Sequence, residues 1–393
     1  MTLTRRAALA LPALVSSVSL PRPGATQAGG GNFRIAVSAN LRALDPAKTT
    51  TGEEYMYDVL VFNGLTRMRE DLTVEPELAE SWEFAEDLKT WSFRLRRGVR
   101  FHHGREMTAD DVIATFTRIL DPATASPVRT NYDMVAGMEA PDPHTVVFRL
   151  KYPYGGFADI LSDRQAKILP RDRIEDIATA PIGTGPFVFR SYAPGDRLVV
   201  ARNAEYWEAG QPRFDQVELR ILPEMAVRIA ALQAGDLDAV WDLGPENVRQ
   251  LREARDIRVE SVATASWDGA IMNNRIPPFN DPRVRRAFHL AVPKADVVEA
   301  VLFGQGAPTI SPIPPTHPFY ARDVVLPTRP DAAGARRLLA EAGHRGPVRV
   351  PLVIPVGRPL RERLGVTLQQ MARPAGFEID IQRVPFGRYA AAV

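Results

Sequence analysis

Adjacent histidines are the first residues of this chain whose types could do chemistry, since imidazole is a common metal ligand. His102 and His103 fall in a segment with strand character, and neighbouring side chains of a strand point to opposite faces. The remaining histidines are scattered without an HExxH pattern, and the chain contains no cysteine. The pattern therefore favours no protein-only metal site and predicts no cofactor.

Clustered glycines could instead suggest a phosphate-binding loop at Gly183-Thr184-Gly185. That stretch lacks the Lys-Ser/Thr ending of a P-loop, and Val188 stands where the GxGxxG spacing requires glycine, so we predict a structural turn. No GxSxG elbow is present. The acidic pairs Asp110-Asp111 and Glu53-Glu54 are explained as helix caps and solvated faces. We expect a binding scaffold; an exported hydrolase would need a nucleophile with an adjacent base.

Residues 217–241 predict the strand, helix, strand unit that would position a ligand site. Apolar and polar residues alternate over 217–221, a helix is predicted over 223–235, and 237–241 reads as the next strand. A crossover of this kind joins parallel strands. Further along, we predict a hairpin over 91–101, a strand over 349–354, a helix over 359–372 and a strand over 377–384.

Composition limits the class of protein. The 393 residues predict more than one domain, and 45% apolar with 24% charged residues is typical of globular proteins. The formal net charge of +2 includes three arginines in the first 31 residues, so the rest of the chain is close to neutral. Nothing in this balance predicts nucleic-acid binding.

The N-terminus is typical of an export signal over residues 1–28. Thr4-Arg5-Arg6 precedes an apolar run at 7–20 and small residues at 25–28. The arginine pair favours the twin-arginine route and leaves Sec export open. The apolar run is shorter than the ~20 residues that span a bilayer, so we expect no stable membrane insertion. Without a cysteine to acylate, the chain is expected to be periplasmic.

Several longer motifs together resemble one family, the extracytoplasmic solute-binding proteins of ABC importers, in the peptide and nickel class called family 5. The motifs spread over residues 33–390. They are Leu44-Asp45-Pro46, LAESWEF at 78–84, WSFRLRRGVRFHHG with TADDV at 91–112, GTGP at 183–186, N-x-x-Y-W at 203–207, A-L-x-x-G-x-x-D at 231–238, PPFNDPRVRRAF at 277–288 and DAAGARRLLAEAG at 331–343.

The resemblance implies an α/β, periplasmic binding protein-like fold of the class II type, with two lobes and an extra inserted domain. Domain I would comprise residues 29–49 and 180–265, inserted domain II residues 50–179, and domain III residues 266–393. Family members continue through more of domain III and return to domain I. We therefore expect the C-terminal part of the second lobe to be missing, as in a truncated record or gene fragment.

The resemblance also suggests site residues. Dipeptide-binding members carry an arginine in a PVxRP context that faces the ligand carboxylate, and Arg358 stands in PVGRP here. A guanidinium group offers the two parallel donors that a carboxylate needs. Thr51 and Gly52 fall at the first crossing between domains, and Trp267 opens domain III. A packing or solvated role is the alternative for each of them.

The function implied is capture of di- and oligopeptides in the periplasm, with delivery to a permease and its ATPase. We expect a monomer that is not an enzyme and binds no metal, cofactor or nucleic acid. A nickel chelate, an opine, haem or an oligosaccharide is the alternative ligand on the same fold. A non-functional gene fragment is the other alternative.

Overall fold

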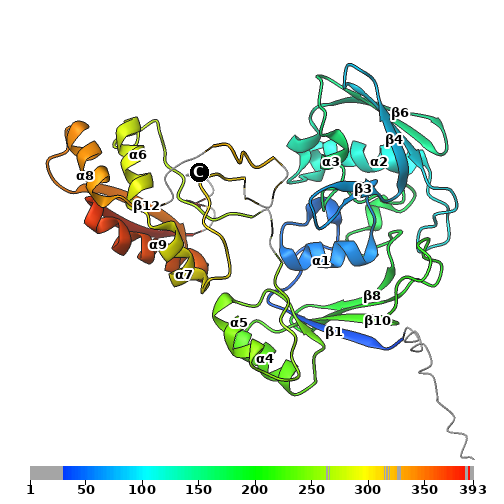
Figure 1. The fold of residues 1–393 in the computed structure, drawn as a ribbon. Coiled ribbons are helices and arrows are strands. Elements are labelled where there is room, and N and C mark those ends of the chain that lie inside the picture. Colours follow the sequence, from blue (N-terminus) through cyan, green and yellow to red (C-terminus); the bar gives the residue numbers. More distant parts are fainter. Residues whose placement is uncertain are drawn as a thin grey trace, which may run out of the picture.

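The computed structural model describes residues 30–262, 264, 266–313, 315, 317, 319–324, 329–385 and 388–389. These residues form two lobes, shown at the right and left of Figure 1. We call residues 30–252 the large lobe and residues 268–385 the small lobe. The predicted export signal, with Arg5 and Arg6, lies outside the described residues. Within the described part of the chain, no helix is both long and apolar enough to cross a bilayer.

The first sheet of the large lobe has five strands in the order β11-β1-β10-β9-β8. Strand β1 (Asn32–Val37) lies parallel to both β10 (Gln216–Ile221) and β11 (Ala239–Val240), with helix α4 (Met225–Gln233) connecting the latter two. The predicted strand, helix, strand unit is thus confirmed. Strands β8 (Phe187–Ala193) and β9 (Arg197–Arg202) complete the sheet in antiparallel pairing.

The second sheet of the large lobe is antiparallel, in the order β4-β5-β7-β6. Its strands are β4 (Ala79–Phe84), β5 (Thr90–Leu95), β6 (Val135–Asp142) and β7 (Thr145–Leu150), and helix α2 (Ala109–Leu120) contacts it. Trp91, Phe93, Phe148 and Phe157 are fully or almost fully buried here and form an aromatic core. Burying such large apolar side chains is the main source of stability in a protein without disulfides.

The hairpin predicted over 91–101 is wrong. Strand β5 pairs with β4 and β7, whereas Arg100 makes only an isolated bridge to Glu106. Val99 and Phe101 are buried nonetheless, because the turn after β5 inserts both side chains into the core. The alternating burial of these two residues therefore resembles that of a strand, although the segment is not paired as a strand.

Shorter elements complete the large lobe. They are helices α1 (Gly52–Val61), α3 (Phe157–Ile160) and α5 (Pro245–Arg252), strands β2 (Thr66–Met68) and β3 (Val74–Pro76), and 3₁₀ helices at Pro46–Lys48, Pro122–Thr124, Arg129–Tyr132 and Ile174–Asp176.

The small lobe contains two parallel strands, β12 (Val348–Pro355) and β13 (Phe377–Val384), in continuous register. Helices α6 (Pro282–Ala291), α7 (Lys294–Leu302), α8 (Ala332–Glu341) and α9 (Pro359–Ala372) pack around them, and a 3₁₀ turn covers Arg373–Ala375. The strands and helix predicted over 349–384 are confirmed. Phe288 and Phe377 meet edge to face in this core, with ring centroids 5.2 Å apart.

The GTGP turn joins the two sheets of the large lobe. Gly183 and Gly185 approach the last turn of α1 so closely that Gly185 N donates to Val61 O at 2.9 Å. His102 holds the turn from the other side: its Nδ1 accepts from Gly183 N at 3.3 Å, and its Nε2 donates to Gly185 O at 3.0 Å. Burial lowers the pKa of His102 to about 4, which keeps the neutral ring that these bonds require. The predicted structural turn is confirmed.

Candidate functional site

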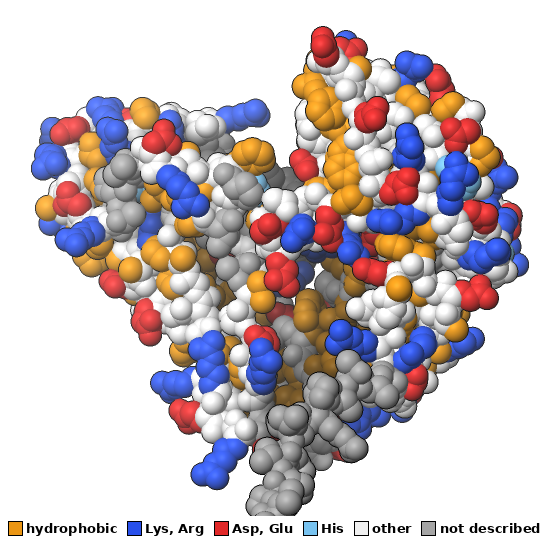
Figure 2. Space-filling view, turned by 45° about the vertical axis from the view of Figure 1, so that its right-hand side comes forward, with side chains coloured by type: hydrophobic (Ala, Val, Ile, Leu, Met, Phe, Trp, Pro, Cys, Tyr) orange, Lys and Arg blue, Asp and Glu red, His pale blue; other side chains and the backbone are white. Residues whose placement is uncertain are grey.

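A deep notch separates the two lobes in the space-filling view (Figure 2). Four segments carry the predicted site residues or contact them: the start of α1, the chain after β11, residues 267–268, and the start of α9. Two contacts link these segments. The ring of Trp241 lies against Gly52, and Arg361 in the first turn of α9 forms an ion pair with Asp268 at 3.1 Å.

Thr51 occupies the N-cap of α1, where its hydroxyl accepts from Glu54 N at 3.4 Å. In return, the Glu54 carboxylate accepts from the backbone N–H groups of Thr50 and Thr51 at 2.6 and 2.9 Å. Its other oxygen accepts from Arg42 N at 2.8 Å and Ala43 N at 3.1 Å. The hydroxyl of Thr51 is therefore engaged in a capping box, and its backbone N–H and carbonyl groups are engaged as well, by Glu54 and by Tyr55 N.

The side chain of Glu54 is fully buried, yet its ionised form is favoured. Burial alone would raise the pKa of this carboxyl, but the four backbone hydrogen bonds outweigh burial and hold the pKa below its ordinary value. One carboxylate thus fixes both the loop at 42–43 and the crossing at 50–51. The start of α1, which carries Thr51 and Gly52, is consequently held in place by hydrogen bonds to one buried carboxylate.

Gly52 begins α1 beneath the indole ring of Trp241. A Cβ atom on Gly52 would lie 2.1 Å from Cη2 of Trp241, so only glycine fits without moving the ring. Trp241 is itself held through its backbone: its N donates to Ala36 O, and Arg228 Nη1 donates to its carbonyl oxygen, both at 3.2 Å. Sequence reasoning treated Trp241 only as the end of a strand. Its position could have indicated a role in the site: Trp241 follows the carboxyl end of β11, and ligands of α/β proteins bind beyond the carboxyl ends of parallel strands.

The chain leaves the first sheet directly after Trp241. Asp242 adopts a left-handed conformation with φ of 57°, which is uncommon for a residue other than glycine. This turn redirects the chain into α5. An unusual backbone conformation next to a candidate site is a feature expected where a site must be held in place.

Trp267 lies at the edge of the small lobe with 41% of its surface exposed. A Cβ atom on Gly269 would lie 1.9 Å from Cζ3 of Trp267, so the indole ring folds back over its own chain. Arg358 is the N-cap residue of α9 and follows Gly357, which has a φ of 74°. The backbone oxygen of Arg358 accepts from Glu362 N at 3.0 Å, which closes the first turn of α9.

One ion pair connects the lobes beside this site. Arg363 on α9 approaches Glu246 on α5 at 3.1 Å, and both side chains are more than a third exposed. Exposed pairs of this kind contribute only about 0–1 kcal/mol. The pair therefore contributes little to holding the two lobes together.

The two histidines considered as metal ligands contact different partners. His102 contacts the GTGP turn, whereas His103 Nε2 lies 3.2 Å from Oδ2 of Asp172. Among the residues that the structure describes, no group of three or more His, Asp or Glu side chains is placed to hold a metal ion.

Comparison with known proteins places these features in a family. Residues 73–393 match the model of the bacterial extracellular solute-binding proteins, family 5 Middle. Di/tripeptide-binding protein 2 of Pseudomonas aeruginosa is 32% identical over 398 residues, which cover 92% of this chain and 74% of that protein.

Solved structures agree on the fold. The periplasmic binding protein DppA from Helicobacter pylori, in complex with the peptide STSA, superposes with a TM-score of 0.77 at 26% identity and covers 92% of this chain and 75% of that one. AgaA from A. tumefaciens R10, in complex with agropinic acid, gives 0.76 at 25% identity, covering 92% and 74%. The predicted α/β, periplasmic binding protein-like fold is confirmed. The chain belongs to the bacterial extracellular solute-binding proteins of family 5.

Proposed function

We propose that this protein captures di- and oligopeptides in the periplasm and delivers them to the permease and ATPase of an ABC importer. The observation that carries the proposal is the 32% identity to a di/tripeptide-binding protein over 92% of this chain. The peptide-bound H. pylori neighbour supports it. The protein would act as a monomer, without catalysis, and would reach the periplasm through the signal at residues 1–28.

The proposed binding site lies between the lobes. Domain I (29–49 and 180–265) with inserted domain II (50–179) would form one jaw, and domain III (266–393) the other. Closure would bend the chain where it crosses between the domains. The weak Glu246–Arg363 pair supports this idea, since little free energy is needed to break it.

Four residues are proposed to contact the peptide: Thr51, Gly52, Trp267 and Arg358. Thr51 and Gly52 would line the site at the start of α1, where the backbone N–H of Gly52 would meet the peptide main chain, bound as an added strand. Trp267 has the exposed ring that an apolar side chain of the ligand could contact. Arg358 would bind the terminal carboxylate through two parallel donors. Water between the jaws would accommodate varied side chains.

Thermal unfolding in the presence of candidate ligands tests this function. A ligand at 100 times its Kd adds about 2.7 kcal/mol to the free energy of unfolding, which raises Tm measurably. We expect alanine-based di- and tripeptides to raise Tm, and nickel with histidine, agropinic acid and an oligosaccharide to leave it unchanged. A rise in Tm with one of those three and none with any peptide would reject peptide binding.

A further inference from the structure

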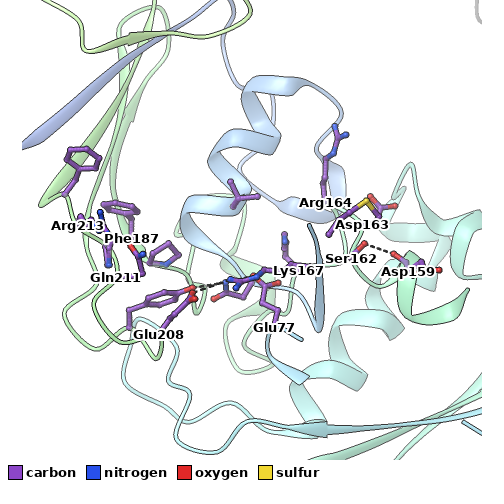
Figure 3. Close-up of a pocket in the computed structure, with 18 of the residues that line it drawn as sticks. Glu77, Asp159, Ser162, Asp163, Arg164, Lys167, Phe187, Glu208, Gln211 and Arg213 are labelled. Atoms are coloured by element: carbon purple, nitrogen blue, oxygen red, sulfur yellow. Dashed lines mark hydrogen bonds and ion pairs between the residues drawn. The ribbon is translucent and has the colours of Figure 1, made fainter. Parts of the chain in front are cut away.

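A cavity lies within the large lobe, and none of its described lining residues belongs to the small lobe. It has a volume of about 970 Å³. Its walls come from the end of α1, strand β2, residues 159–167, the GTGP turn and the loop at 206–214 (Figure 3). Small-molecule sites in proteins commonly have a volume of this order. The proposed peptide site shares none of these residues.

Lys167 is the unusual residue of this cavity. Only 5% of its surface is exposed, and its side chain lies in the middle of the cavity wall between α1 and Glu77 (Figure 3). No hydrogen bond or ion pair of its side chain is found within the described part of the chain. Lysine is almost never buried without a partner, because an unpaired buried charge is costly. Lys167 therefore points to a missing anion.

The two glutamates of the wall do not supply that anion. Glu77 accepts hydrogen bonds from Asn63 Nδ2 at 2.8 Å and from Gly64 N at 2.7 Å. Glu208 lies 3.3 Å from Nη1 of Arg67. Both carboxylates thus have partners of their own.

The nearby aspartates are also poor partners. Burial raises the pKa of Asp58 well above its ordinary value, although Lys167 opposes that rise, and burial raises the pKa of Asp159 as well. No ion pair joins Lys167 to Asp58, Asp159 or Asp163 among the described residues. Asp163 accepts a hydrogen bond from Asn131 Nδ2 at 3.4 Å.

Apolar side chains line another part of the cavity. Val59, Met68 and Phe214 are 51%, 48% and 41% exposed, which is high for large apolar residues, and Phe187 lies close by in the wall. Two further cations, Arg164 and Arg213, line the wall as well. The walls thus combine the buried Lys167, other charged side chains of both signs and uncovered apolar surface.

We propose that this cavity binds an organic acid with an apolar body, whose carboxylate pairs with the ammonium group of Lys167. The apolar body would cover Val59, Met68 and Phe214. A charge-assisted pair in a secluded site is stronger than one at the surface, and apolar burial adds to the affinity. The site is independent of the proposed peptide site.

Calorimetry with phenylacetate and its neutral amide, phenylacetamide, tests the proposal in the wild-type protein. We expect phenylacetate to bind at millimolar concentration and phenylacetamide to bind at least tenfold more weakly, because the amide has no charge to pair with Lys167. Equal affinity for acid and amide, or no binding of phenylacetate, would overturn the proposal and leave a lysine that is merely hydrated. This comparison needs no variant.

Two variants locate the site. Lys167→Met keeps an apolar chain of similar length and should weaken phenylacetate binding at least tenfold. Lys151→Met is the matched control, because the Lys151 ammonium donates to the backbone oxygen of Asp133, outside the cavity. This variant should bind phenylacetate as tightly as wild type does. Saturating dipeptide should leave phenylacetate binding unchanged. Displacement by dipeptide would place the probe between the lobes and contradict the assignment, whether or not the peptide function holds.

Discussion

Gly183→Ala is expected to lower the free energy of unfolding by about 3 kcal/mol or more, the upper end of the range for overpacking. The new Cβ atom would lie 2.0 Å from Val61 O and 2.6 Å from Cδ1 of Phe62. Neither side can yield easily. Val61 O accepts from Gly185 N in the same turn, and Phe62 is fully buried.

Urea unfolding followed by circular dichroism measures this loss. Gly155→Ala is the matched control, because its Cβ atom would meet only Cδ1 of Leu88 at 3.9 Å, an ordinary contact. We expect the control to unfold within about 1 kcal/mol of wild type. A Gly183→Ala protein as stable as the control would show that the GTGP turn does not depend on close approach to α1.

Glu54→Gln is expected to cost about 3 kcal/mol of unfolding free energy. The amide keeps the size of the side chain, but its nitrogen is a donor and would face two backbone N–H groups, such as those of Thr50 and Thr51. Each buried donor left without an acceptor costs about 1–3 kcal/mol. Glu53→Gln, one residue away, is the control. Among the described residues, Glu53 accepts a hydrogen bond from Ser38 Oγ alone, at 2.6 Å. Because that hydroxyl can also accept, Glu53→Gln should lose less unfolding free energy.

The effect of Glu54 should depend on pH. The pKa of Glu54 is lowered in the folded protein, so its stabilisation is fully present above the unfolded value of about 4.3 and is lost as the pH falls through the folded pKa. The difference between wild type and Glu54→Gln should therefore narrow below about pH 4. A difference that stays constant from neutral pH down into that range would contradict the role assigned to the charge.

The sequence predicted the helices and strands better than the contacts within the candidate site. Parallel strands β10 and β11 and the elements of 349–384 were predictable, because their periodic apolar residues and flanking glycines reflect local rules. The role of Trp241 was not, since its contact with Gly52 joins residues far apart in the chain. The false hairpin at 91–101 has the same origin: Val99 and Phe101 are buried by a turn, and burial pattern alone cannot distinguish a turn from a strand.

The candidate site residues show the same limit. Glu53 and Glu54 were interpreted as helix caps and solvated faces, but the structure buries both, and only Glu54 caps the helix, together with the hydroxyl of Thr51. No local sequence pattern predicts that Lys167 is buried, because residues from four other segments of the chain surround it. Motifs therefore predicted where the chain turns, whereas the contacts across those turns required the structure.

Peptide capture through a terminal carboxylate is tested most directly by calorimetric titration of alanylalanylalanine and its C-terminal amide. Loss of a charge-assisted hydrogen bond costs about 1.5–3 kcal/mol, so Arg358→Ala should bind the free tripeptide at least tenfold more weakly than wild type. Arg349→Ala, which removes an exposed arginine paired with Glu378 on the neighbouring strand, should bind as wild type does. The amidated peptide should bind wild type weakly and be indifferent to Arg358→Ala. Equal affinity of wild type for the free and amidated peptides would contradict the account.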